Sequence, residues 1–283
     1  MYVSMKEILQ DARTGGYAVG AFNIVNFLTA QAAVKAAEET VSPLIIQTSV
    51  STVKQIGPRA LIVFLKQLSE DASVPVAVHL DHCTDEALVM QCLKLGWSSV
   101  MIDLSKAAFE ANVEATRRVV QEAQRVGATV EGELGAIFGV EDDIKVDSRE
   151  ASLADPQKSI EYCERTGVSA FAPAIGTAHG LYKGEPVVAF DLFDTIVRSI
   201  DVPMVVHGGT GLSMEVFQRL ISIGAAKINI STAVKIAYCG AMHDYTAAHP
   251  TENNPLKLDA YALDKTVQCV KDHIAIFGSA GRA

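Results

Sequence analysis

Short apolar, β-rich segments alternate with longer segments of helical periodicity along almost the whole chain. A strand buried on both faces has a nearly continuous apolar run, whereas a surface helix repeats apolar residues every three or four positions. The segments predicted as strands are Tyr17–Asn23, Pro43–Ser49, Val74–His82, Ser98–Ser105, Ala128–Leu134, Ala170–Ile175, Pro203–His207 and Ala225–Ser231. The segments predicted as helices between them are Thr29–Thr40, Pro58–Ala72, Asp85–Leu95, Phe109–Val126, Pro156–Thr166, Asp191–Ser199 and Ser213–Ile223.

This alternation predicts a (β/α)8 TIM barrel, because eight β-then-α units can close on themselves. A doubly wound open sheet is the alternative, but its glycine-rich turn follows the first strand. Here the turn Gly208 to Gly211 follows only the seventh predicted strand. From residue 232 to 283 we expect the last barrel helix and extra C-terminal helices, of which Leu258–Phe277 is the clearest. We therefore expect a single α/β domain over residues 1–283.

Composition narrows the class of protein without deciding the function. With 49% hydrophobic and 20% charged residues, the chain has the composition of a soluble globular protein. The net charge of -9 argues against an extended nucleic-acid surface. No apolar run is long enough for a membrane span, and residues 1–13 lack a signal-peptide pattern. We expect a cytoplasmic protein that binds neither nucleic acid nor membrane.

The cysteines fit a reducing compartment, because they are widely spaced and form no CxxC pair. Structural thiols are the default interpretation. Cys83 adjoins His82, so it is the one thiol weighed as a metal ligand.

Polar residues gather where the predicted strands end, which is the face on which barrel enzymes place their chemistry. Every strand contributes at least one residue there or in the loop that follows. The set is Asn23, Gln47, Ser49, Asp81, His82, Asp103, Ser105, Glu131, Glu133, His179, His207, Asn229 and Ser231.

Three histidines of this set come from different strands or loops, namely His82, His179 and His207. Three neutral imidazoles with an open fourth position are typical of a catalytic zinc site, in which the metal polarises a carbonyl. Asp81 can then serve as a base beside the metal. The alternative is that the histidines are separate loop or core residues and that the aspartate caps a helix.

Glycines supply a second signal. The turn from Gly208 to Gly211 and the segment from Asn229 to Thr232 follow strands seven and eight, where barrels most often bind phosphate through backbone N–H groups. Gly180 adds another close approach of the backbone. The alternative is that these glycines serve turn geometry alone.

Taken in order, these motifs resemble the class II, zinc-dependent fructose-bisphosphate and tagatose-bisphosphate aldolases, the tagatose-bisphosphate branch most of all. The resemblance covers nearly the whole chain. It rests on HLDH at 79–82, SVMIDLS at 99–105, VEGELG at 130–135, GVEDD at 139–143, GTAHGLYKG at 176–184, VVHGGTGL at 205–212, AKINIST at 226–232 and GSAGRA at 278–283.

The resemblance implies reversible aldol cleavage of a ketose 1-phosphate or 1,6-bisphosphate to dihydroxyacetone phosphate and an aldehyde. It assigns His82, His179 and His207 as zinc ligands, Asp81 as the base for the carbon-4 hydroxyl, and Glu141, in a loop, as the group that exchanges a proton with the ketose fragment.

Further assignments follow from the same resemblance. A homodimer or homotetramer is expected, and family members often bind a monovalent cation, Na⁺ or K⁺, beside the phosphate. The phosphate would be bound by Gly180, Gly208, Gly209, Thr210, Asn229 and Thr232. Asp103 and Glu133 would form an alternate metal site or support the ligands. Other residues near the substrate would be Asn23, Gln47, Ser49, Lys183 and Ser231. His79 is expected in an inner layer beneath Asp81.

Two departures from the family pattern bear on specificity. The family's Asp-Pro-Arg, whose arginine binds the distal phosphate, is here Asn254-Pro255-Leu256, and one of two loop glycines is Phe138, followed by Gly139. Losing a bidentate phosphate donor weakens binding of a distal phosphate. An alternative substrate is therefore a ketose 1-phosphate with another distal group, such as the sulfonate 6-deoxy-6-sulfofructose 1-phosphate.

Two other functions compete with this interpretation. A Schiff-base aldolase would need a lysine inside the barrel, and Lys227, the lysine of strand eight, is expected at the amino-terminal end, far from the polar set. A non-catalytic sugar-phosphate-binding barrel is the other, since a fold alone does not give a function.

Overall fold

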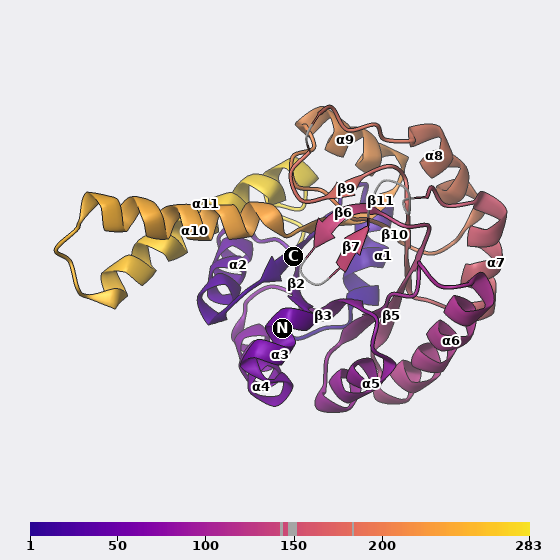
Figure 1. Cartoon of the computed structure of the whole chain (residues 1–283), viewed down its shortest axis with the longest axis horizontal. Coiled ribbons are helices and arrows are strands. Elements are labelled where there is room, and N and C mark those ends of the chain that lie inside the picture. Colours follow the sequence, from indigo (N-terminus) through magenta and orange to yellow (C-terminus); the bar gives the residue numbers. More distant parts are fainter. Residues whose placement is uncertain (142–143, 147–151, 183) are drawn as a thin grey trace.

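The computed structural model describes residues 1–141, 144–146, 152–182 and 184–283 (Figure 1). In this part of the chain, parallel strands close into a barrel in the order β1-β11-β10-β8-β5-β4-β3-β2. The (β/α)8 prediction is confirmed. The barrel strands are β1 (Val19–Ile24), β2 (Leu44–Ser49), β3 (Val76–Cys83), β4 (Ser99–Ile102), β5 (Thr129–Leu134), β8 (Ala170–Pro173), β10 (Met204–Val206) and β11 (Ala225–Ile230).

Helices surround the barrel, and most begin at a capping residue that the sequence supplies. Asp85 accepts a hydrogen bond from the Ala87 backbone N–H, and Asp155 accepts one from that of Lys158. The surrounding helices are α2 (Phe27–Thr40), α3 (Val50–Ile56), α4 (Pro58–Asp71), α5 (Glu86–Leu95), α6 (Phe109–Val126), α7 (Pro156–Thr166), α8 (Phe190–Ser199) and α9 (Met214–Ile223).

An additional helix, α1 (Met5–Gly15), fills the end of the barrel opposite the predicted site. Its apolar face, with Met5, Leu9 and Ala12, is buried with small and branched strand residues such as Ala21 and Ala226. Figure 1 shows α1 within the outline of the barrel. One end of the barrel is therefore closed, and the other remains available for a ligand.

A small sheet lies outside the barrel, in the order β7-β6-β9. It is formed by β6 (Phe138–Glu141), β7 (Ile144–Val146) and β9 (Ala178–His179). Since β9 contains His179, this sheet attaches the segment that follows β5 directly to a predicted ligand.

The C-terminal part consists of α10 (Thr232–Ala248) and α11 (Pro255–Phe277). The carboxyl half of α11 packs on the barrel through residues such as Val270, Ile274 and Phe277. Figure 1 shows the two helices side by side, extending away from the barrel as an arm. Of the helices described, none combines the length and the apolar character needed to cross a membrane.

Candidate active site

The end of β3 is irregular, and this irregularity brings two adjacent side chains into one site. Successive side chains of a regular strand point to opposite faces, so Asp81 and His82 could not both face the barrel interior. The pairing of β3 with β4 shifts between Leu80 and Cys83, and His82 has a φ of 45°. A bulge of this kind redirects a side chain, and the backbone strain costs about 1–3 kcal/mol.

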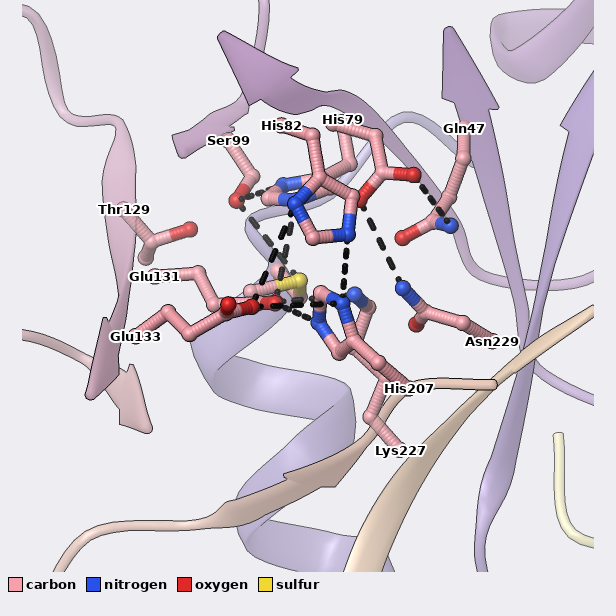
Figure 2. Close-up of polar contacts among 12 residues, drawn as sticks. Gln47, His79, His82, Ser99, Thr129, Glu131, Glu133, His207, Lys227 and Asn229 are labelled. Carbon is pink, nitrogen blue, oxygen red and sulfur yellow. Dashed lines mark hydrogen bonds and ion pairs between the residues drawn. The ribbon is translucent and has the colours of Figure 1, made fainter. Parts of the chain in front are cut away.

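The three predicted histidines converge. His82, His179 and His207 are buried, and each offers a ring nitrogen such that these atoms lie within 4.8 Å of one another. The ring of His82 lies 4.9 Å from that of His179 and 4.5 Å from that of His207, between centroids. Figure 2 shows His82 above His207, with a nitrogen of each ring facing the other.

Carboxylates behind the rings define which nitrogen faces the site. The Nδ1–H of His82 donates to Asp103 Oδ2 at 2.8 Å, and Asp103 Oδ1 accepts from the Ser105 hydroxyl at 2.7 Å. The Nε2–H of His207 donates to Glu131 Oε1 at 2.7 Å. His82 Nε2 and His207 Nδ1 therefore face each other, 2.7 Å apart. Carboxylates placed in this way orient the histidines of metal sites.

The electrostatics of the cluster fit a cation. Burial lowers the pKa of His179 and His207 well below the ordinary value. Burial would also lower the pKa of His82, but Asp81, Asp103 and Glu133 together raise it well above that value. The facing nitrogens of His82 and His207 are therefore placed to share a divalent cation with His179.

A second group of possible ligands shares His82 and adds Asp103 and Glu133. Burial raises the pKa of Glu133 well above its ordinary value, with Asp103 contributing. Asp103 is stabilised as an anion, its pKa held well below the ordinary value by His82 and Ser105 despite burial. Among the described residues, neither group includes Cys83, whose thiol donates to the Asp85 carbonyl oxygen at 3.4 Å. Burial raises the pKa of that thiol to about 11, so it fits a structural cysteine.

Three amide side chains hold the carboxylate of Asp81. Asn23 Nδ2 donates to Asp81 Oδ2 at 2.8 Å, while Asn229 Nδ2 lies 3.5 Å from Oδ1. Gln47 Nε2 donates to Asn23 Oδ1 at 2.8 Å and lies 3.4 Å from Asp81 Oδ2. The carboxylate is thereby fixed beside the histidines as an acceptor. Ser49, also predicted near the substrate, pairs in register with Asp81 and caps α3 through its side chain.

A pocket lies next to His179. Its lining contains the six predicted phosphate-binding residues, Gly180, Gly208, Gly209, Thr210, Asn229 and Thr232, together with His179 and Ser231. The buried Ser231 Oγ has no hydrogen-bond partner within the described part of the chain. Helix α10 begins at Thr232, so its first N–H groups are at the pocket.

The glycines of this pocket also have a packing role. A Cβ atom on Gly208 would lie 2.4 Å from the Ala178 carbonyl oxygen, and one on Gly209 would lie 2.7 Å from that of Asn229. Close packing against the backbone of Ala178 and Asn229 therefore requires these two glycines, whatever binds there.

An inner polar layer lies beneath the histidines, and one expectation about it was wrong. Lys227 is fully buried, and its Nζ lies 2.8 Å from Glu131 Oε2, directly behind His207. It is therefore close to the polar set, because its long side chain reaches Glu131, which is a member of that set. His79 occupies the inner layer as expected and bonds to Ser99 Oγ through Nδ1 at 2.7 Å. Glu131 received no role from the sequence, although it lies two residues before Glu133 and so faces the same side.

Two predicted residues are less fully described. Glu141 ends β6, with its backbone paired to Ile144, but its side chain is outside the description. Lys183 lies outside the described residues. Nearby, Gly139 pairs with His179 at a φ of 115°, and a Cβ there would lie 2.3 Å from the His179 carbonyl oxygen. Phe138, the departure from the family's two glycines, is 47% exposed and meets no such restriction.

Comparison with known proteins places this site in a family. The model of the family described as fructose-bisphosphate aldolase class-II matches residues 3–282. This chain belongs to the class II fructose-bisphosphate aldolases. The resemblance inferred from the motifs is confirmed, and the protein is an aldolase, a carbon–carbon lyase. Its nearness to the tagatose-bisphosphate branch stays a prediction.

Individual aldolases match over nearly their full length. A sulfofructosephosphate aldolase of Alkalicoccus urumqiensis is 37% identical over 282 residues, covering 100% of this chain and 98% of the relative. A fructose-bisphosphate aldolase of Thermus caldophilus is 39% identical over 306 residues, covering 100% of both. Among solved structures, the YdjI aldolase of Escherichia coli K12 has a TM-score of 0.88 and 29% identity, covering 100% of each chain.

Proposed function

We propose that this aldolase, acting as a single barrel domain, cleaves a ketose 1-phosphate or 1,6-bisphosphate reversibly to dihydroxyacetone phosphate and an aldehyde. The observation that carries the proposal is the convergence of three histidine nitrogens within 4.8 Å of one another, beside Asp81. The names of the relatives, which include fructose-bisphosphate and sulfofructosephosphate aldolases, support this substrate class.

We propose Zn²⁺ as the metal, held by His82 Nε2, His207 Nδ1 and a ring nitrogen of His179. Three neutral imidazoles are a common ligand set of catalytic zinc. When bound, zinc polarises the ketose carbonyl and stabilises the negative charge that develops on it. Asp103 and Glu133 support His82 or provide an alternate position for the ion.

Proton transfers belong to carboxylates of the chain. Asp81 accepts the proton of the carbon-4 hydroxyl while the carbon 3–carbon 4 bond breaks, and the former hydroxyl becomes the aldehyde carbonyl. The bonding pair stays on carbon 3 of the ketose fragment, and Glu141 supplies the proton that this carbon takes up. The amides of Asn23, Gln47 and Asn229 hold Asp81 in position for the transfer.

The carbon-1 phosphate occupies the pocket beside His179. Ser231 and Thr232 line that pocket where helix α10 begins, and the first turn of a helix favours an anion. We also propose a monovalent cation, Na⁺ or K⁺, beside the phosphate, as the family resemblance implies. We also propose a homodimer or homotetramer, which light scattering of the purified enzyme can determine.

Steady-state cleavage of ketose phosphates, with and without a chelator, tests this proposal. We expect activity that the chelator abolishes and Zn²⁺ restores. The Asp81→Asn variant keeps the shape of the side chain but cannot accept the proton, so it should bind zinc normally and lose about 10²–10⁴-fold in kcat. Activity that survives chelation, with borohydride trapping of the substrate, would show a Schiff-base enzyme. A wild type with no turnover on any ketose phosphate would favour the non-catalytic barrel.

A different distal group is the second candidate, because the arm lacks the family's arginine. Leu256 stands in its place and is 73% exposed. The neighbouring cation, Lys257, forms an ion pair with Glu252. We propose a ketose 1-phosphate with a distal sulfonate, such as 6-deoxy-6-sulfofructose 1-phosphate, as the alternative substrate. Comparison of kcat/KM for bisphosphates and for this sulfonate decides between them, and a strong preference for the bisphosphate refutes the alternative.

A further inference from the structure

The carboxylate of Glu131 joins a buried cation to one of the proposed ligands. Its Oε2 lies 2.8 Å from Lys227 Nζ, and its Oε1 lies 2.7 Å from His207 Nε2. All three side chains are fully buried. In Figure 2, Lys227 lies beside His207, and Glu131 reaches toward them from β5. Each oxygen of the carboxylate therefore has a fixed partner.

A competing partner for Glu131 lies close by. His79 Nε2 is 3.6 Å from Glu131 Oε2 and makes no hydrogen bond within the described part of the chain. If Lys227 did not hold Oε2, the carboxylate could turn toward His79. Oε1 would then leave the line to His207 Nε2, and that ring would no longer be held in one orientation.

Folding alone gives little reason for this buried ion pair. Apolar residues of similar volume often replace a buried pair without loss of stability, because removing two charges from water is costly. The neighbouring layer, where α1 meets the strands, is apolar. The ion pair of Lys227 and Glu131 lies one layer below the histidines. It is therefore better explained by its effect on the orientation of His207 than by a contribution to folding stability.

We propose that Lys227 is a positioning residue for the metal site. By holding Oε2 of Glu131, it keeps Oε1 on His207 Nε2, so that Nδ1 of His207 faces the metal. The proposal rests on the metal site proposed above, not on the identity of the sugar. Outer partners of this kind change metal affinity about 10–100-fold when they are removed.

Metal binding without substrate tests the proposal and keeps it separate from the proposed reaction. Zinc affinity is measured by competition with a chromophoric chelator, and ligand geometry by the visible spectrum of the cobalt(II)-loaded protein. Lys227→Met should weaken zinc binding about 10–100-fold and change the cobalt spectrum. The control is Thr129→Val, which removes a buried hydroxyl one layer deeper on the strand of Glu131, bonded to the Ser98 carbonyl oxygen. This control should leave both measurements unchanged.

A second substitution separates positioning from packing. In Lys227→Met combined with Glu131→Gln, neither charge of the buried pair is left, and the glutamine oxygen still accepts from His207 Nε2. In Lys227→Met combined with Glu131→Leu, that acceptor is lost. The first double variant should recover most of the zinc affinity and the second should not, and this comparison stands even if Lys227→Met alone does not fold. Wild-type affinity in Lys227→Met, or equal affinities in the two double variants, would overturn the proposal.

Discussion

Gly139 connects the segment that carries Glu141 to the strand that carries His179, and replacing it with alanine should disconnect them. Its backbone pairs with His179 at a φ of 115°. A Cβ atom there would lie 2.3 Å from the His179 carbonyl oxygen and 2.9 Å from its backbone nitrogen. Both are backbone atoms, so no side-chain rotation can relieve the contact.

The cost can be estimated from these contacts. The unfavourable φ costs about 1–3 kcal/mol, and overpacking adds about 1–3 kcal/mol. Only two residue pairs, Phe138 with Ala178 and Gly139 with His179, join β6 to β9. We therefore expect β6 to separate from β9 while the barrel stays folded. A loss of about 2 kcal/mol in placing Glu141 corresponds to roughly a 30-fold lower kcat.

The assay measures kcat for ketose phosphate cleavage, zinc affinity and the thermal unfolding temperature of Gly139→Ala. We expect a lower kcat, a weaker zinc site because His179 shifts, and nearly unchanged unfolding. Phe138→Ala is the matched control, since its side chain is 47% exposed and the variant should retain activity within about twofold. Wild-type kcat and zinc affinity in Gly139→Ala would refute the connection.

Further predictions concern the ligands and their supports. Asp103→Ala removes the acceptor of His82 Nδ1, so zinc affinity should fall about 10–100-fold in chelator competition, and unchanged affinity would contradict the assigned role. The pH dependence of stability follows mainly from His79, His179 and His207, whose pKa values burial lowers in the folded state; His82 and Glu133, whose pKa values are raised, act in the opposite direction but are two groups against three. The contribution of these three histidines is fully present above the unfolded pKa of about 6.5, and it is lost as pH falls, because their rings then take up protons only in the unfolded chain. The metal-free enzyme should therefore unfold at lower temperature at pH 5 than at pH 7, by calorimetry; a higher unfolding temperature at pH 5 would contradict this.

The periodicity of apolar residues predicted the barrel well, because each β-then-α unit buries its strand and one face of its helix in the same way. Phe109–Val126 and Pro156–Thr166 were predicted with the bounds that the structure has. The helix α1 was not predicted, since its apolar face is short and covers the barrel end instead of a sheet face. The sheet β7-β6-β9 was also missed, because β9 is only a two-residue strand.

Within the site, the types of residue at the strand ends predicted the cluster better than the positions of residues along their strands predicted individual contacts. Histidines and carboxylates at strand ends predicted the cluster that the structure brings together, but the bulge that turns His82 inward left no signal in the local pattern. Lys227 was misplaced because the reach of its side chain, rather than its Cα position, decides what it contacts. Alternation offered a signal, since Lys227 lies two residues before Asn229 and shares its facing.

The central claim is that one ion is shared by three imidazoles. Crystals of the zinc-loaded enzyme, with anomalous diffraction measured on both sides of the zinc absorption edge, test it most directly. We predict one zinc peak per chain, about 2.0–2.1 Å from a ring nitrogen of each of His82, His179 and His207. A zinc peak that His179 and His207 do not ligate, or no peak among the three rings in zinc-loaded crystals, would contradict the account.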